Sequence, residues 1–233
     1  MTMISNAKLK ILLLAGLIFP FVLQFFSHVA QASELISQIA YVLSKILFVL
    51  LPLFYWLITR VQPIEHKGSH RTFAIISGLA LCAAIFLLAQ IFIEFIRPQA
   101  EHIYQTLNVL GLTKNLLLYS AGIIILNSLF EEFFWRYSIY GGLKTYFSIR
   151  TAMIVSSIGF AGSHMLYFVG LFDSLAVITL LTCASFIFGC FWVWLYEKTR
   201  SVWHVWLNHM LLNLPLFYVE YAILTQLTSG TSI

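Results

Sequence analysis

The stretch TFAIISGLALCAAIFLLAQIFIEFI, residues 72–96, decides the fold of this chain. Its one charged side chain, Glu94, lies near the end of an otherwise apolar run. About 20 mostly apolar residues are enough to cross the hydrocarbon core of a bilayer as a helix. Backbone groups in lipid must find their hydrogen bonds within the segment, so a run of this length is helical. The stretch therefore predicts a membrane-spanning α-helix.

Six further runs have a similar length and composition. They lie near residues 9–27, 35–59, 115–140, 151–170, 173–197 and 201–225. None shows the alternating polarity of a barrel strand. We therefore expect an all-α fold, a polytopic bundle of about seven transmembrane helices. Residues 98–111 are too polar to span and predict a short helix at the membrane interface, and the lack of linkers or repeats predicts a single domain, 1–233.

The composition of the whole chain excludes the soluble classes of protein. Hydrophobic residues make up 61% of the chain and charged residues 9%, where a soluble domain carries about 25% charged residues. Disorder requires low hydrophobicity and high charge, which is the opposite pattern. The small net charge of +4 comes from short loops, so it gives no reason to expect nucleic-acid binding.

Apart from Arg97 and Lys114 in the stretch 97–114, the basic residues of the loops fall in every second loop. They are Lys8 and Lys10 before the first span, Arg60, Lys67 and Arg71 after the second, Lys144 and Arg150 after the fourth, and Lys198 and Arg200 after the sixth. Lys and Arg accumulate on the cytoplasmic side of membrane proteins. We therefore expect an integral, multi-pass protein with its N-terminus inside. Short loops and a basic inner face favour the inner membrane of a bacterium.

Residues 1–32 allow two interpretations. Two lysines, an apolar run and Ala30-Gln31-Ala32 before Ser33 resemble a secretory signal peptide with its cleavage site after Ala32. The apolar run is long for a signal peptide, so we expect a retained first span. Both interpretations leave the topology of the later spans unchanged.

Ionisable residues concentrate in the fourth predicted span, at Phe130-Glu131-Glu132-Phe133-Phe134-Trp135-Arg136. Charged side chains inside a membrane helix are costly and mark functional sites by default. Glu132 and Arg136 are four residues apart and can pair on one helix face. Glu131 is turned about 100° away, and Asn127 lies one turn before it. A clamp that only holds helices together needs one carboxylate for its arginine, so the second acid favours a general base.

The fifth and seventh spans carry polar groups at a similar depth. His164 lies in the fifth, and His209 and Asn213 share a face of the seventh because they are four residues apart. A single histidine in a membrane helix is often a packing residue. Two histidines, an asparagine and an unpaired glutamate on three helices favour a site. These residues can meet only if the helices tilt or break.

The three motifs, taken together, resemble those of the CPBP family, the CAAX prenyl endopeptidases and bacteriocin-processing enzymes that are also called the Abi family. The motifs are Glu131-Glu132-x-x-x-Arg136, Phe160-x-x-x-His164 and His209-x-x-x-Asn213, and Ser201-Val202-Trp203 lies eight residues before His209, as it usually does in the family. The resemblance covers about residues 115–215. Family members commonly have Gly after the motif arginine, where this chain has Tyr137.

The resemblance implies an intramembrane glutamic protease without a cofactor or metal. Glu131 would be the general base and His164 would orient the same water. His209 and Asn213 would form the oxyanion hole, and Glu132 with Arg136 would hold the fourth helix in place. His204 and Asn208 also fit the third motif, but the spacing to Ser201 favours His209 and Asn213. The partners would be a membrane-anchored protein or peptide and the bilayer.

Three other functions remain open at this point. A non-catalytic immunity or scaffolding protein is the main alternative, and such roles are also proposed within the family. A zinc protease is disfavoured because the chain has no HExxH motif. A transporter is disfavoured because the chain has no inverted repeat. The substrate and the oligomeric state cannot be inferred from the sequence.

Overall fold

A computed structural model describes residues 3–30, 32–63 and 70–229, and within these residues the elements are all helices joined by short loops, with no strand. Gln31 of the candidate cleavage site and Lys67 of the second basic loop lie outside the described residues. The α-helices are α1 (Met3–Gln24), α2 (Glu34–Thr59), α3 (Arg71–Ile96), α4 (Ala100–Val109), α5 (Leu116–Gly122), α6 (Ser128–Glu132), α7 (Gly141–Leu143), α8 (Ile149–Leu171), α9 (Leu175–Thr199) and α10 (Val202–Ser229).

The predicted all-α membrane bundle is confirmed. Six helical stretches are long and apolar enough to cross a membrane: Asn6–Val29, Glu34–Thr59, Arg71–Ile91, Thr113–Leu143, Ile149–Leu171 and Leu175–Thr199. Each coincides with one of the predicted spans. The seventh predicted span corresponds to α10, which is 28 residues long. It is not among the six, since histidine, asparagine and glutamate side chains interrupt its apolar sequence. The polar stretch after α3 forms the short helix α4.

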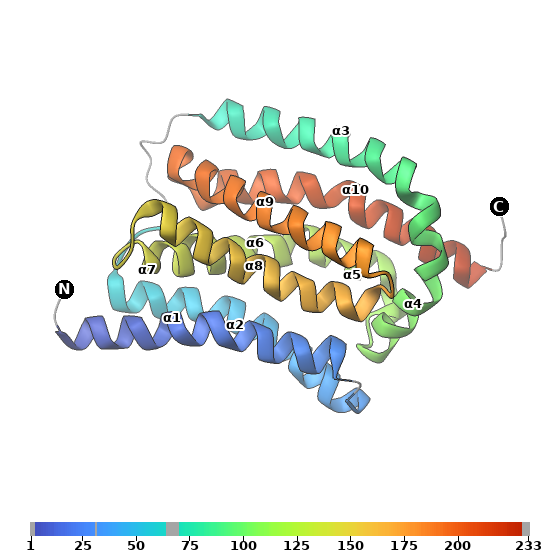
Figure 1. Cartoon of the computed structure of the whole chain (residues 1–233), viewed down its shortest axis with the longest axis horizontal. Helices are drawn as coiled ribbons and strands as arrows, with labels where there is room; N and C mark the ends of the chain where they lie inside the picture. The colour runs from blue at the N-terminus through green and yellow to red at the C-terminus, as the bar shows by residue number, and fades with distance from the viewer. Residues whose placement is uncertain (1–2, 31, 64–69, 230–233) are drawn as a thin grey trace.

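The long helices run roughly parallel to one another, as Figure 1 shows. The pair α1 and α2 lies on one side of the bundle, and α3 lies on the opposite side with α10 beneath it. Helix α8 packs on α9. The stretch from α5 to α7 runs through the middle of the bundle, where it contacts α2, α8, α9 and α10. The glutamates of the first motif therefore lie on a helix that has other helices on several sides.

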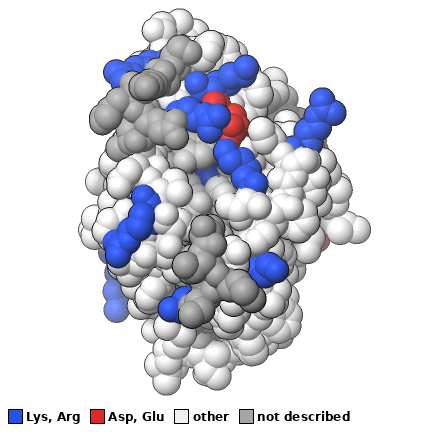
Figure 2. Space-filling model, turned by 90° about the vertical axis from the view of Figure 1, so that its left-hand side faces the viewer, with Lys and Arg blue, Asp and Glu red and all other residues white. Residues whose placement is uncertain are grey.

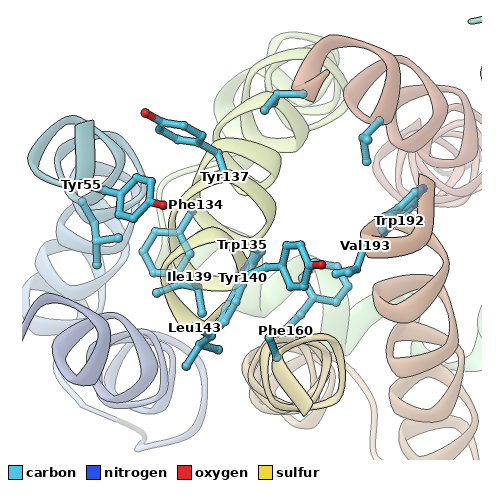
Figure 3. Packing of buried hydrophobic residues seen from close by; sticks show 14 of the residues in the cluster. Tyr55, Phe134, Trp135, Tyr137, Ile139, Tyr140, Leu143, Phe160, Trp192 and Val193 are labelled. Carbon is cyan, nitrogen blue, oxygen red and sulfur yellow. The ribbon is translucent and has the colours of Figure 1, made fainter. Parts of the chain in front are cut away.

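The interior is aromatic and closely packed. Phe134, Trp135 and Tyr140 are at most 1% exposed. Figure 3 shows Trp135, Tyr140 and Phe160 in the space between the central helix, α8 and α9. Leucine, isoleucine and phenylalanine side chains are exposed along the outer faces of α1, α2 and α3, as expected where lipid rather than water surrounds the protein.

Two π-helical segments interrupt the central helix on either side of the paired glutamates. They are η4 (Ile123–Asn127) and η5 (Phe133–Tyr140). A π-turn adds a residue to the helical repeat, and such turns occur frequently at functional sites. Tyr137, which replaces the glycine common in the family, lies in η5. Its hydroxyl donates to the Val61 carbonyl, and its ring packs on Tyr55. These two contacts of Tyr137, which a glycine could not make, link the central helix to the end of α2.

One end of the bundle is basic. Figure 2 shows Lys and Arg side chains spread over this end, with few acidic ones. The first residues of α1, α3, α8 and α10 lie at this end. Lys144 and Arg200 both pair with Glu197 at this end, at 2.5 and 3.2 Å. The charge distribution is the one that the predicted orientation requires of the cytoplasmic face.

Glycines on α8 allow the N-terminal helices to approach closely. A Cβ atom at Gly162 would lie 2.6 Å from the ring of Phe21, and one at Gly170 would lie 2.6 Å from Cβ and 2.7 Å from the carbonyl oxygen of His28. The Gly170 carbonyl also accepts from Thr106 of α4. Small residues permit such contacts between membrane helices. Gly170 therefore joins three parts of the chain at the non-basic end.

We expect Gly170→Ala to lower the free energy of unfolding by about 1–3 kcal/mol, because the methyl group meets backbone atoms that cannot rotate away. Gly122→Ala is the matched control, since nothing lies within 4 Å of a Cβ atom there, and it should leave stability unchanged or slightly raised. Thermal unfolding of both variants in the same lipid measures the difference. Equal melting temperatures would contradict this close contact.

Candidate active site

The carboxylate of Glu132 contacts two side chains, those of Arg136 and His209. Its Oε1 atom lies 3.1 Å from Arg136 Nη1 and 2.7 Å from His209 Nδ1. Glu132 and Arg136 are at most 1% exposed, and His209 is 3% exposed. The contact with Arg136 is the i, i+4 pair that the sequence predicts, and the contact with His209 links the central helix to α10. Buried charges are tolerated when they are paired in this way.

Aromatic rings enclose the guanidinium group of Arg136. Its Cζ atom lies 4.5 Å from the ring centre of Phe160 and 5.0 Å from that of Trp192. The Trp192 ring also stacks on His209, with 3.9 Å between centroids. Cation–π contacts of this kind are stronger when water is excluded. Trp192 was not predicted, because a tryptophan within an apolar span carries no signal that separates it from packing residues.

Glu131 faces away from this ion pair, as helical geometry predicts. Its Oε1 atom accepts from Asn127 Nδ2 at 2.7 Å, and Asn127 Oδ1 accepts from Lys45 Nζ at 2.6 Å. Its Oε2 atom lies 3.9 Å from His164 Nε2 and 3.9 Å from His209 Nε2. One oxygen of Glu131 is thus held by a neighbour, while the other faces two imidazole nitrogens.

The tautomer of His164 follows from its backbone contact. Its Nδ1 atom lies 2.9 Å from the Phe160 carbonyl. A carbonyl oxygen can only accept, so Nδ1 carries the hydrogen. In the neutral ring Nε2 then has a free lone pair, and that atom is the one directed at Glu131. The Nδ1 of His209 likewise donates, because its partner is the Glu132 carboxylate.

A cavity of about 300 Å³ contains these groups. Glu131, His164, His209 and Asn213 line it, together with Lys45 and many apolar side chains. A mostly apolar cavity with a few convergent polar groups is the usual form of a binding or active site. Asn213 lies one helical turn beyond His209 on the same wall.

The structure thus places five of the six predicted site residues within 4 Å of another of the six, and the sixth, Asn213, on the wall of the same cavity. His204 and Asn208, the alternative residues for the third motif, lie outside this group of side chains. The Asn208 amide accepts from Trp192 Nε1 and donates to the Ala74 carbonyl of α3. His204 and Asn208 do not line the cavity.

Lys45 is a second residue of the site, after Trp192, that the sequence analysis does not predict. It is a lone charged side chain in the middle of α2, and its Nζ lies 4.8 Å from the ring centre of Tyr41. The sequence does carry a signal for it, because placing a lysine inside a membrane span costs about as much free energy as placing a glutamate there. Most of the other basic residues lie in loops, so the basic residues as a set indicate membrane orientation and not a site.

Within residues 3–30, 32–63 and 70–229, no three His, Cys, Asp or Glu side chains are grouped in a way that could hold a metal ion. At 3.9 Å from each histidine nitrogen, Glu131 Oε2 makes no direct hydrogen bond with either ring, and the three side chains line the same cavity.

Residues 113–215, a little under half of the chain, match the family model described as Type II CAAX prenyl endopeptidase Rce1-like. The resemblance to the CPBP family is confirmed. The matched segment contains all three CPBP motifs. Lys45 lies before it and Glu220 after it. Comparisons with curated proteins and with solved structures gave no match.

The buried ion pair of the first CPBP motif should dominate local stability. We expect Arg136→Met to lower the free energy of unfolding by about 3–5 kcal/mol, because it leaves the Glu132 carboxylate without its arginine in a medium of low polarity. Arg200→Met also breaks an ion pair, but that arginine side chain is 44% exposed, so its loss should cost less than about 1 kcal/mol. Unfolding measurements on both variants test this, and equal losses would show that burial of the pair does not matter.

Proposed function

We propose that the chain is an intramembrane endopeptidase that hydrolyses a peptide bond of a membrane-associated protein or peptide. The observation that carries this proposal is the position of Glu131 Oε2, 3.9 Å from the Nε2 atoms of both His164 and His209 in an apolar cavity. The family match supports a membrane endopeptidase in general terms. The catalytic roles below are those that the resemblance to the CPBP family implies.

Glu131 and His164 are suited to activating a water molecule. A water with hydrogen bonds of about 2.8 Å to each fits between two atoms 3.9 Å apart. The water would donate one hydrogen to Glu131 Oε2 and the other to His164 Nε2, whose lone pair is free. Proton transfer to the Glu131 carboxylate would leave a hydroxide to attack the peptide carbonyl.

His209 and Asn213 are suited to stabilising the oxyanion that forms. His209 Nδ1 donates its hydrogen to Glu132 at 2.7 Å. When Nε2 also carries a hydrogen, it is a second donor of the same ring, and it faces the cavity. The Asn213 side-chain amide supplies another donor on the same wall. Donors that are fixed before the reaction stabilise developing charge without reorganisation.

Three further residues position the reacting groups. Arg136 and Glu132 hold His209 in place. Lys45 holds the Asn127 side chain so that its amide nitrogen faces Glu131. In this scheme the Glu131 carboxylate keeps one oxygen bound and one free, and the free oxygen is the base.

Glu131→Gln should reduce cleavage of a membrane-tethered peptide by at least about 10²-fold, because glutamine keeps the shape of the side chain but cannot accept the proton. Glu101→Gln on α4 is the control, since Glu101 is exposed and should leave the rate unchanged. Purified wild type and both variants would be assayed in lipid, with a strong chelator in parallel. Activity that survives Glu131→Gln would overturn the proposed base, and loss of activity on chelation would indicate a metalloenzyme.

Lys45→Met should lower kcat by about tenfold or more and leave KM within about twofold, because it disturbs the base and not the substrate. Lys45→Arg should restore part of the rate by keeping a donor for Asn127. Asn127→Ala and Lys45→Met should be non-additive, since both break one chain of contacts to Glu131. Additive losses of kcat, or a change confined to KM or to the melting temperature, would contradict the proposed role of Lys45 in positioning Glu131.

A further inference from the structure

Glu220 is a second acid in the cavity, and it takes no part in the chemistry proposed above. It lies on α10, half-buried, and lines the same cavity as Glu131. Its Oε1 atom is buried and has no hydrogen-bond partner among the described residues. No ion pair joins Glu220 to a cation within that part of the chain. A buried acid without a partner has a cost in free energy, so its presence indicates a functional role for Glu220.

One continuous face of α10 connects Glu220 to the proposed oxyanion hole. The residues of α10 that line the cavity recur at helical spacing: His209, Leu212, Asn213, Leu216, Phe217, Val219, Glu220, Ile223 and Leu224. At about 1.5 Å per residue, Glu220 lies about 10 Å from Asn213 and about 16 Å from His209 along the helix. An extended peptide advances about 3.3 Å per residue, so these lengths correspond to three to five residues.

The wall that α10 supplies between the two ends is apolar, and the cavity also holds a second polar atom without a partner. Leu216 and Phe217 lie between Asn213 and Glu220 on the cavity wall, and Leu107 of α4 also lines the cavity. His28 lines it too, and its buried Nε2 atom has no partner among the described residues. Both unpartnered atoms can accept a hydrogen bond.

We infer that Glu220 is a substrate-binding residue for a cationic group, an ammonium or a guanidinium, three to five residues from the bond that is cleaved. Such a group carries only donors and a positive charge, which complements a carboxylate and a free imidazole nitrogen. The preferred substrate would then have a short apolar stretch at the cut site with a lysine or arginine beyond it. This inference rests on the proposed function, because it assumes that a peptide occupies the cavity.

Binding can be tested without relying on catalysis. The Glu131→Gln protein, in nanodiscs of phosphatidylglycerol, would be titrated with labelled apolar peptides that carry one Lys at successive positions on either side of the cut site. Matched peptides would have Leu or Glu at the same positions. We expect Lys peptides to bind at least tenfold more tightly than Leu peptides at positions three to five on one side. Glu220→Gln should remove that preference, and Glu220→Lys should shift it to the Glu peptides.

The outcomes separate this inference from the proposed function. Equal binding of Lys and Leu peptides, or a Lys preference that survives Glu220→Lys, would overturn the inference even if Glu131 is essential for cleavage. Loss of the Lys preference only when phosphatidylethanolamine is added would assign the cationic group to a lipid headgroup instead. Cleavage that does not depend on Glu131 would overturn the proposed base and leave the binding result standing. Melting temperatures of both Glu220 variants would establish that each is folded.

Discussion

The arrangement of the site depends on one buried carboxylate, that of Glu132. It contacts Arg136 one turn along its own helix and His209 on α10, and so joins the central helix to the C-terminal helix. In a membrane interior no water is available to replace either contact, so separating the two helices would leave charges unpaired. The aromatic rings of Phe160 and Trp192 complete the enclosure by covering the guanidinium group. The position of His209 is therefore a consequence of where the Glu132 carboxylate lies.

The two adjacent glutamates differ because successive residues of a helix point in different directions. Glu132 faces the ion pair and is fully buried, whereas Glu131 faces the cavity. Asn127 of the central helix donates to one of its oxygens, and Lys45 of α2 in turn donates to Asn127. A contact from α2 means that the arrangement around the proposed base extends beyond residues 113–215, the segment that matches the family model. The N-terminal helices thus contribute to the site as well as to the bundle.

Much of this arrangement could be predicted from the sequence, for specific physical reasons. The spans were predictable because lipid requires long apolar helices, and the pairing of Glu132 with Arg136 was predictable because residues four apart share a face. The contact between His209 and Glu132 was not, since it joins residues 77 apart whose meeting depends on how the helices tilt. The π-turns around the glutamates change the helical register locally, which no periodic pattern reveals. Lys45 and Glu220 were visible as charges within apolar stretches, but only the cavity shows that both face the same space.

The central claim is that Glu131 and His164 hold a water molecule and not a metal ion. A high-resolution experimental structure of the wild-type protein in lipid tests it most directly. Our account predicts an ordered water about 2.8 Å from Glu131 Oε2 and from His164 Nε2, with His209 Nε2 facing the same space. Density for a metal ion with protein ligands at about 2.0–2.2 Å, the two histidines and Glu131 drawn in around it, would contradict the account.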